Sequence, residues 1–264
     1  MTQETPTTHF QHPQLGFSEQ TTYICKKKKT TMKKHIPNCI TLLNLFSGCV
    51  GVIMAFHKQF DYALLCMLLS AAFDFCDGMA ARALKAYSNI GKELDSLADV
   101  VSFGFLPGML AFQLLHASSL TDTCQALPYL AFIITLFSAL RLAKFNVDER
   151  QTTGFIGLAT PANALFWGSL AATYKEFITT HPYLLVGLCI VMAYLLVAEL
   201  PFFSLKFKNL HWKENKTRFL FLIGCVPLLI VFTKGAFVWI IAWYIALAIT
   251  NNIVAKKSAS PAQN

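Results

Sequence analysis

The most informative part of this chain is the stretch Asp74-Phe-Cys-Asp77-Gly-Met-Ala-Ala-Arg82, followed further along by Gly91-Lys-Glu-Leu-Asp95-Ser-Leu-Ala-Asp99. Its spacing is D-x2-D-G-x2-A-R-x8-G-x3-D-x3-D, and apolar residues surround it on both sides. Ionisable side chains are costly in apolar membrane segments, so they are usually kept there for a function. Because the chain has only 14 acidic residues, this grouping of four marks a candidate functional site.

The sequence around this motif has the composition of a membrane protein. Of the 264 residues, 55% are hydrophobic and 14% are charged, whereas about a quarter of the residues in soluble domains are charged. Apolar stretches of about the length that crosses a bilayer occur at residues 39–56, 62–84, 94–115, 126–146, 155–174, 182–200, 217–233 and 236–253. They do not alternate between apolar and polar residues, which favours helices over a β-barrel. We expect an all-α, polytopic membrane bundle with about eight transmembrane helices.

The two ends of the chain differ in composition from this apolar part. Residues 1–31 are rich in Thr, Gln and Lys, so we expect a disordered extension. Residues 32–254 form the expected membrane domain, and residues 255–264 form a polar tail. With eight alternating helices, most of the 22 basic residues fall on one side of the membrane, which the positive-inside rule makes cytoplasmic.

This topology predicts a protein of the cell membrane with both termini in the cytoplasm. It also places the acidic motif at the cytoplasmic ends of the second and third helices. The basic residues follow the topology and do not form one patch, so nucleic acid is not an expected partner.

The spacing of the four acids predicts a metal site. Residues three or four apart share a helix face, so Asp74 pairs with Asp77 and Asp95 pairs with Asp99. Four carboxylates that converge need cations between them, and carboxylate oxygens favour Mg²⁺ or Mn²⁺. We expect two such ions. The eight Cys and seven His have no metal-ligand spacing, which argues against zinc and against a disulfide frame.

The residues between the acids suit a phosphate substrate. Paired divalent ions promote substitution at phosphorus, and Arg82 would add a cation beside the phosphates. The small residues Gly78, Ala81 and Gly91 would let a ligand approach the helix backbone closely, and Gly91 with Lys92 is expected to make the turn between the two helices. The alternatives are tight helix packing for the small residues and a snorkelling cation for Arg82.

At these positions the chain resembles the CDP-alcohol phosphotransferase superfamily, whose signature has the same spacing. The strings Ile36–Gly48, Glu93–Gly104 and Leu140–Asn146 are similar to its phosphatidylserine synthase branch. The resemblance implies that an alcohol displaces CMP from a CDP-linked lipid with the help of two divalent cations. It also implies a homodimer.

The resemblance assigns roles by position. The implied metal ligands are Asp74, Asp77, Asp95 and Asp99, and Asp99 is also the implied general base. The residues implied to surround the CDP group are Asp74, Gly78, Ala81, Arg82 and Gly91.

The branch resemblance predicts CDP-diacylglycerol and L-serine as substrates. Serine brings a carboxylate that needs a basic partner, and Arg141 or Lys144 near the end of the fourth helix could supply one, with Asn146 offering an amide. The alternative for these cations is positive-inside anchoring. Two other functions stay open. One is a related transferase that uses glycerol 3-phosphate, and the other is an ion-coupled transporter, which would place carboxylates near the bilayer midplane.

Overall fold

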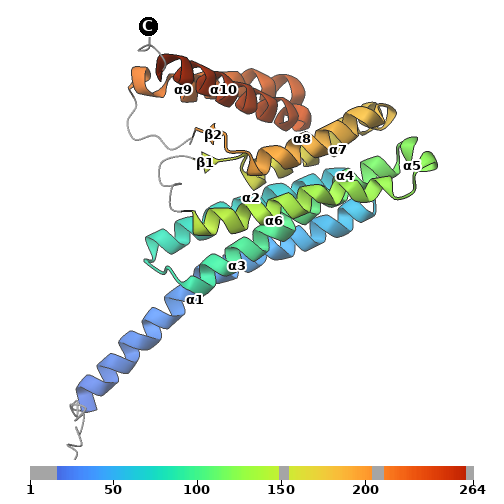
Figure 1. Cartoon of the computed structure of the whole chain (residues 1–264). Helices are drawn as coiled ribbons and strands as arrows, with labels where there is room; N and C mark the ends of the chain where they lie inside the picture. Colours follow the sequence, from blue (N-terminus) through green and yellow to red (C-terminus); the bar gives the residue numbers. More distant parts are fainter. Residues whose placement is uncertain (1–16, 149–154, 204–210, 260–264) are drawn as a thin grey trace, which may run out of the picture.

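Long apolar helices make up nearly all of the structure, a computed structural model that describes residues 17–148, 155–203 and 211–259 (Figure 1). In chain order the helical elements are α1 (Phe17–Phe56), α2 (Phe60–Ala83), α3 (Asn89–Asp99), the π-helix η1 (Val100–Phe105), α4 (Leu106–His116), α5 (Leu120–Thr123), the 3₁₀-helix η2 (Leu127–Phe132), α6 (Ile133–Val147), α7 (Thr160–Thr180), α8 (Pro182–Val197), α9 (Trp212–Phe232), the 3₁₀-helix η3 (Thr233–Gly235) and α10 (Ala236–Ala259). Two short strands, β1 (Phe155–Ile156) and β2 (Pro201–Phe202), pair antiparallel.

The predicted multi-pass helical membrane bundle is confirmed. Among the described residues, the segments long and apolar enough to cross a membrane are His35–Phe56, Phe60–Ala83, Asn89–His116, Leu127–Val147 and Asn215–Val254. The last of these five contains both α9 and α10, α7 is not among them, and α8 is a shorter apolar helix. Each of the eight expected stretches overlaps a helix, but the count of eight spans stays a prediction.

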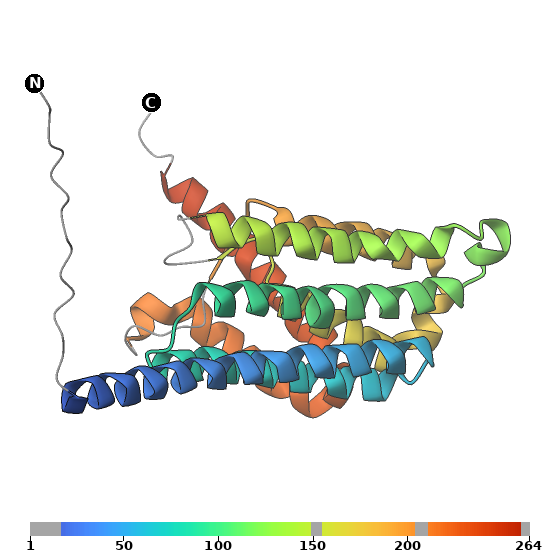
Figure 2. The same cartoon turned by 90° about the horizontal axis from the view of Figure 1, so that it is seen from below.

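The first helix begins earlier than the sequence indicated. Residues 1–16 of the expected disordered extension lie outside the described residues, but from Phe17 the backbone is helical and continues into the first span without a break. Figures 1 and 2 show this early part of α1 extending beyond the rest of the bundle. At the other end, α10 continues to Ala259, so its last turns occupy the first part of the expected polar tail.

The apolar stretch expected at residues 155–174 is not helical from its start. It opens with strand β1 and a left-handed Gly157 (φ 81°), and α7 begins only at Thr160. Pro161 is compatible with this start, because proline is well tolerated in the first turn of a helix, where its missing N–H breaks no hydrogen bond.

Helix α1 brings the two halves of the acidic motif together. It packs against α2, α3 and η1, and at Gly48 the approach to η1 is so close that an added Cβ would lie 2.9 Å from the Cα of Ser102. Figure 2 shows that the start of α1, the α2–α3 loop and the end of α10 lie at one end of the bundle, opposite α5. The α2–α3 loop and the residues beside it form the candidate site.

Candidate active site

Three carboxylates from α2 and α3 meet beside α1. One oxygen from each of Asp74, Asp95 and Asp99 lies within 4.8 Å of the other two. Asp99 is buried, the other two are half-buried, and the buried Oδ1 of Asp95 has no hydrogen-bond partner among the described residues. Converging negative charges of this kind attract a cation, and an all-oxygen donor set suits a hard divalent ion. These residues therefore fit a metal centre.

The fourth predicted ligand, Asp77, lies near this cluster but has a different partner. Its Oδ2 accepts a hydrogen bond of 2.6 Å from Oγ1 of Thr41 on α1. Asp77 is buried, and it lines the same cavity as Asp95. The structure therefore groups three of the four predicted carboxylates, and α1 holds the fourth beside them.

One face of α1 supports the acidic residues. Asn44 is fully buried, and its Nδ2 donates to Oδ1 of Asp99 at 3.2 Å. Its backbone carbonyl accepts hydrogen bonds from Ser70 of α2 and Ser102 of η1. The face is formed by residues spaced at helical intervals, namely Pro37, Thr41, Asn44 and Gly48. Thr41 and Asn44 had no predicted role, although polar residues on one face of an apolar helix are a signal that could have indicated them.

A cavity of about 220 Å³ opens between α1, the end of α2 and the start of α3. Gly78, Ala81 and Gly91, the three small residues of the motif, all line it together with Asp77. An added Cβ at Gly78 would meet nothing within 4 Å, so this glycine faces open space. Arg82 is exposed and is not one of the described residues that line the cavity. The three small residues therefore line this cavity, and Arg82 lies outside its described lining.

The turn between α2 and α3 lies earlier than expected. Residues 84–88 form it, with Lys85 in the left-handed region (φ 50°), and Gly91 lies in the first turn of α3. The reason is Ser88, whose Oγ accepts a hydrogen bond from the backbone N–H of Gly91 at 3.0 Å. A serine that caps a helix in this way satisfies a backbone donor that would otherwise have no partner.

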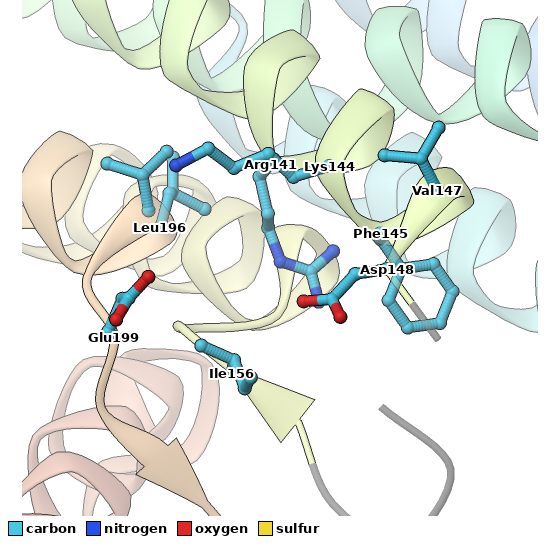
Figure 3. A pocket seen from close by; sticks show the side chains of 9 residues that line it. Arg141, Lys144, Phe145, Val147, Asp148, Ile156, Leu196 and Glu199 are labelled. Carbon is cyan, nitrogen blue, oxygen red and sulfur yellow. The ribbon is translucent and has the colours of Figure 1, made fainter. Parts of the chain in front are cut away.

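A second cavity, of about 320 Å³, contains two of the residues predicted to bind serine (Figure 3). Arg141 and Lys144 both line it. Arg141 is 7% exposed, and its Nη1 lies 3.5 Å from Oγ1 of Thr160 on α7. Its Nε has no hydrogen-bond partner among the described residues.

Asn146, the third residue predicted to bind serine, contacts α3. Its Nδ2 donates to Oγ of Ser96 at 2.8 Å, and its carbonyl accepts from Nζ of Lys92 at 2.9 Å. It is not among the described residues that line the second cavity. These contacts connect the end of α6 to α3, so the structure gives Asn146 a part in packing.

The comparison with protein families decides where the chain belongs. A model of the CDP-alcohol phosphatidyltransferase family matches residues 34–250. The chain belongs to this family. The match includes both halves of the acidic motif, the supporting face of α1 and the second cavity.

Three similar proteins illustrate the place of this CDP-alcohol phosphatidyltransferase in its family. A CDP-diacylglycerol–serine O-phosphatidyltransferase of Bacillus subtilis is 34% identical over 169 residues, which cover 64% of this chain and 89% of the relative. An archaetidylserine synthase of Methanothermobacter thermautotrophicus is 30% identical over 169 residues, which cover 62% of this chain and 70% of the relative. A CDP-diacylglycerol–serine O-phosphatidyltransferase of Helicobacter pylori is 29% identical over 205 residues, or 75% and 81%.

Proposed function

We propose that this protein transfers the phosphatidyl group of CDP-diacylglycerol to L-serine and releases phosphatidylserine and CMP. The observation that carries the proposal is the meeting of Asp74, Asp95 and Asp99 within 4.8 Å of one another. The names of the similar proteins support serine as the acceptor.

The proposed cofactor is a pair of Mg²⁺ or Mn²⁺ ions held by the three clustered carboxylates and by Asp77 beside them. Bound divalent ions neutralise phosphate oxygens and stabilise the charge that develops on a leaving phosphate. Asp99 accepts the proton of the serine hydroxyl. Because Asn44 donates to Oδ1 of Asp99, it fixes the orientation of the carboxylate and leaves Oδ2 for that proton.

The transfer is a direct displacement. The serine hydroxyl oxygen forms a bond to the phosphatidyl phosphorus while the bond from that phosphorus to the CMP oxygen breaks, and Asp99 takes the hydroxyl proton. The four Asp of the signature are assigned to the metal ions and to the hydroxyl proton, so no covalent enzyme intermediate is expected. Arg141 and Lys144, which line the second cavity, bind the serine carboxylate.

We place the protein in the cell membrane with both termini and the acidic cluster on the cytoplasmic side. The start of α1 and the end of α10 lie at the same end of the bundle as the α2–α3 loop, which agrees with this topology (Figure 2). The family resemblance further suggests a homodimer. Measurement of the mass of the protein–detergent complex tests the homodimer, and a monomeric mass would contradict it.

The proposal is tested by purified protein with CDP-diacylglycerol, Mn²⁺ and a panel of labelled alcohols. We expect phosphatidylserine from serine, and no exchange of labelled CMP into CDP-diacylglycerol when the alcohol is left out. A lipid product from glycerol 3-phosphate alone would favour the alternative transferase. Exchange of CMP at the turnover rate would contradict direct displacement, and the absence of any lipid product would contradict the proposed transfer.

Gly78 offers a test of the first cavity as the CDP-lipid site. We expect Gly78→Ala to raise the KM for CDP-diacylglycerol about tenfold, equivalent to about 1.4 kcal/mol, because the new methyl group enters the cavity. The fold should be unaffected or stabilised by about 0.5–1 kcal/mol, since alanine favours a helix interior. Steady-state kinetics and thermal unfolding measure the two effects.

Gly187 is the matched control for this variant. It lies inside α8, and an added Cβ there also meets nothing within 4 Å. Gly187→Ala should therefore change stability in the same direction and leave the KM for CDP-diacylglycerol unchanged. An equal change of KM in both variants would show that the Gly78 effect is not local.

A further inference from the structure

The second cavity is lined by side chains of both charges (Figure 3). Arg141 and Lys144 come from the last two turns of α6, and Glu199 comes from the short segment between α8 and β2. Apolar walls separate these charges, and they include Phe145, Ile156 and Leu196. The cavity therefore offers binding partners for both a negative and a positive group.

Lys144 and Glu199 are not paired with each other. Within the part of the chain that the structure describes, the side chain of neither one has a hydrogen bond or an ion pair. Both are exposed, and both line the same cavity. A second acid on its wall, Asp148, has an interaction of its own. Lys144 and Glu199 therefore keep their binding capacity for a ligand that carries both charges.

Backbone contacts hold Glu199 in place. The N–H of Gly157 donates to the carbonyl of Leu200 at 3.0 Å, and the N–H of Leu158 donates to the carbonyl of Leu195 at 2.8 Å. Gly157 is left-handed, and an added Cβ there would lie 2.4 Å from the carbonyl oxygen of Leu196. Glu199 lies between the two anchored residues, Leu195 and Leu200, so its backbone is held on both sides.

Arg141 connects this cavity to the acidic cluster. It lines the cavity, it is buried, and its charge lies close enough to Asp99 for the two to attract each other. A small molecule bound at Arg141 would therefore lie within electrostatic range of the carboxylate that accepts the hydroxyl proton in the proposed reaction.

We propose that Glu199 binds the ammonium group of the acceptor, while Arg141 and Lys144 bind its carboxylate. The inference rests on the proposed serine transferase function, and it adds the residue that selects an amino acid over alcohols without an ammonium group. Glycerol 3-phosphate would bring only negative charge to the cavity, and Glu199 would repel it. The site is thus matched to a zwitterion.

The test combines two variants with two inhibitors that each lack one charged group of serine. 3-Hydroxypropanoate lacks the ammonium group, and ethanolamine lacks the carboxylate. We expect Glu199→Gln to raise the KM for serine and the Ki of ethanolamine roughly tenfold to hundredfold, because a charge-assisted hydrogen bond is lost. The Ki of 3-hydroxypropanoate and the KM for CDP-diacylglycerol should not rise.

Lys144→Gln should have the opposite selectivity: it should raise the Ki of 3-hydroxypropanoate more than the Ki of ethanolamine. Glu176→Gln is the control for the loss of one negative charge, since Glu176 is exposed near the end of α7 and lines none of the cavities described above. It should leave all four constants unchanged. Glu199→Asp keeps the charge with a shorter reach, so its KM for serine should lie between those of the wild type and Glu199→Gln.

If Glu199→Gln keeps the wild-type KM for serine while the wild type makes phosphatidylserine, the inference is wrong and the proposed function stands. If Glu199→Gln weakens the binding of serine and of both inhibitors equally, Glu199 has a structural role and the inference is also wrong. If the wild-type protein does not use serine at all, the proposed function fails and the inference fails with it.

Discussion

Asp99→Asn is expected to lower turnover about 10²–10⁴-fold, which is the usual contribution of a general base. The amide keeps the shape of the side chain and can still pair with Asn44, which donates to Oδ1 of Asp99 in the structure. It cannot take a proton from the serine hydroxyl, and it is a poorer ligand for a divalent ion. The rate of CMP release at saturating substrates measures the effect, and equilibrium binding of CDP-diacylglycerol should be largely retained.

Two measurements separate the loss of the base from the loss of a metal ligand. Measuring the activity of Asp99→Asn at increasing Mn²⁺ concentrations shows how much of the rate the metal restores. The loss of rate that remains at saturating Mn²⁺ is due to the missing general base. Asp122→Asn is the matched control, because Asp122 lies on α5 at the opposite end of the bundle. A variant at residue 99 that keeps most of its turnover would contradict the proposed base.

The acidic site could be predicted from the sequence because its chemistry conflicts with its surroundings. Carboxylates in an apolar stretch indicate a function, and helical spacing places Asp95 and Asp99 on one face. The structure confirms that Asp74 joins these two. The same logic found the small residues Gly78 and Ala81, which line a cavity beside the acids.

The contacts between different helices could not be predicted in this way. The spacing of residues predicts which side chains share a helix face, but it does not predict which residues of other helices contact that face. Thr41 and Asn44 therefore had no assigned role, and the hydrogen bond from the Asn146 amide to Ser96 was not predicted. Glu199 lies within the apolar stretch expected at residues 182–200 but beyond the end of α8, and its place on a cavity wall depends on backbone contacts between segments far apart in the sequence.

The boundaries of the helices show a similar limit. Glycine at position 91 suggested a turn, but the cap formed by Ser88 starts α3 before it. Composition suggested an unstructured chain up to residue 31, but the described backbone is helical from Phe17. Capping interactions and helix continuation act over a few residues, whereas composition averages over many. Predictions from composition were therefore better for the class of the fold than for its boundaries.

Removal of divalent cations should abolish phosphatidylserine formation, and added Mg²⁺ or Mn²⁺ should restore it. The physical reason is that Asp74, Asp95 and Asp99 converge within 4.8 Å, so without a cation they repel one another and would repel the pyrophosphate of the substrate. Ca²⁺ should restore less activity, because its longer bonds to oxygen and looser geometry fit a small site poorly. If chelator-treated protein kept its full rate of phosphatidylserine formation, the proposed metal centre would be wrong.

A second readout does not depend on the reaction. A ligand that binds only the folded state stabilises it by about 2.7 kcal/mol at a concentration of 100 times its Kd, so Mn²⁺ added to metal-free protein without any lipid substrate should raise the unfolding temperature. Asp95→Asn should lose this shift, because it removes an acid whose buried Oδ1 has no hydrogen-bond partner among the described residues. Asp122→Asn should keep it. An equal Mn²⁺ shift in both variants would mean that the ion binds elsewhere, and the three carboxylates would then need a different explanation.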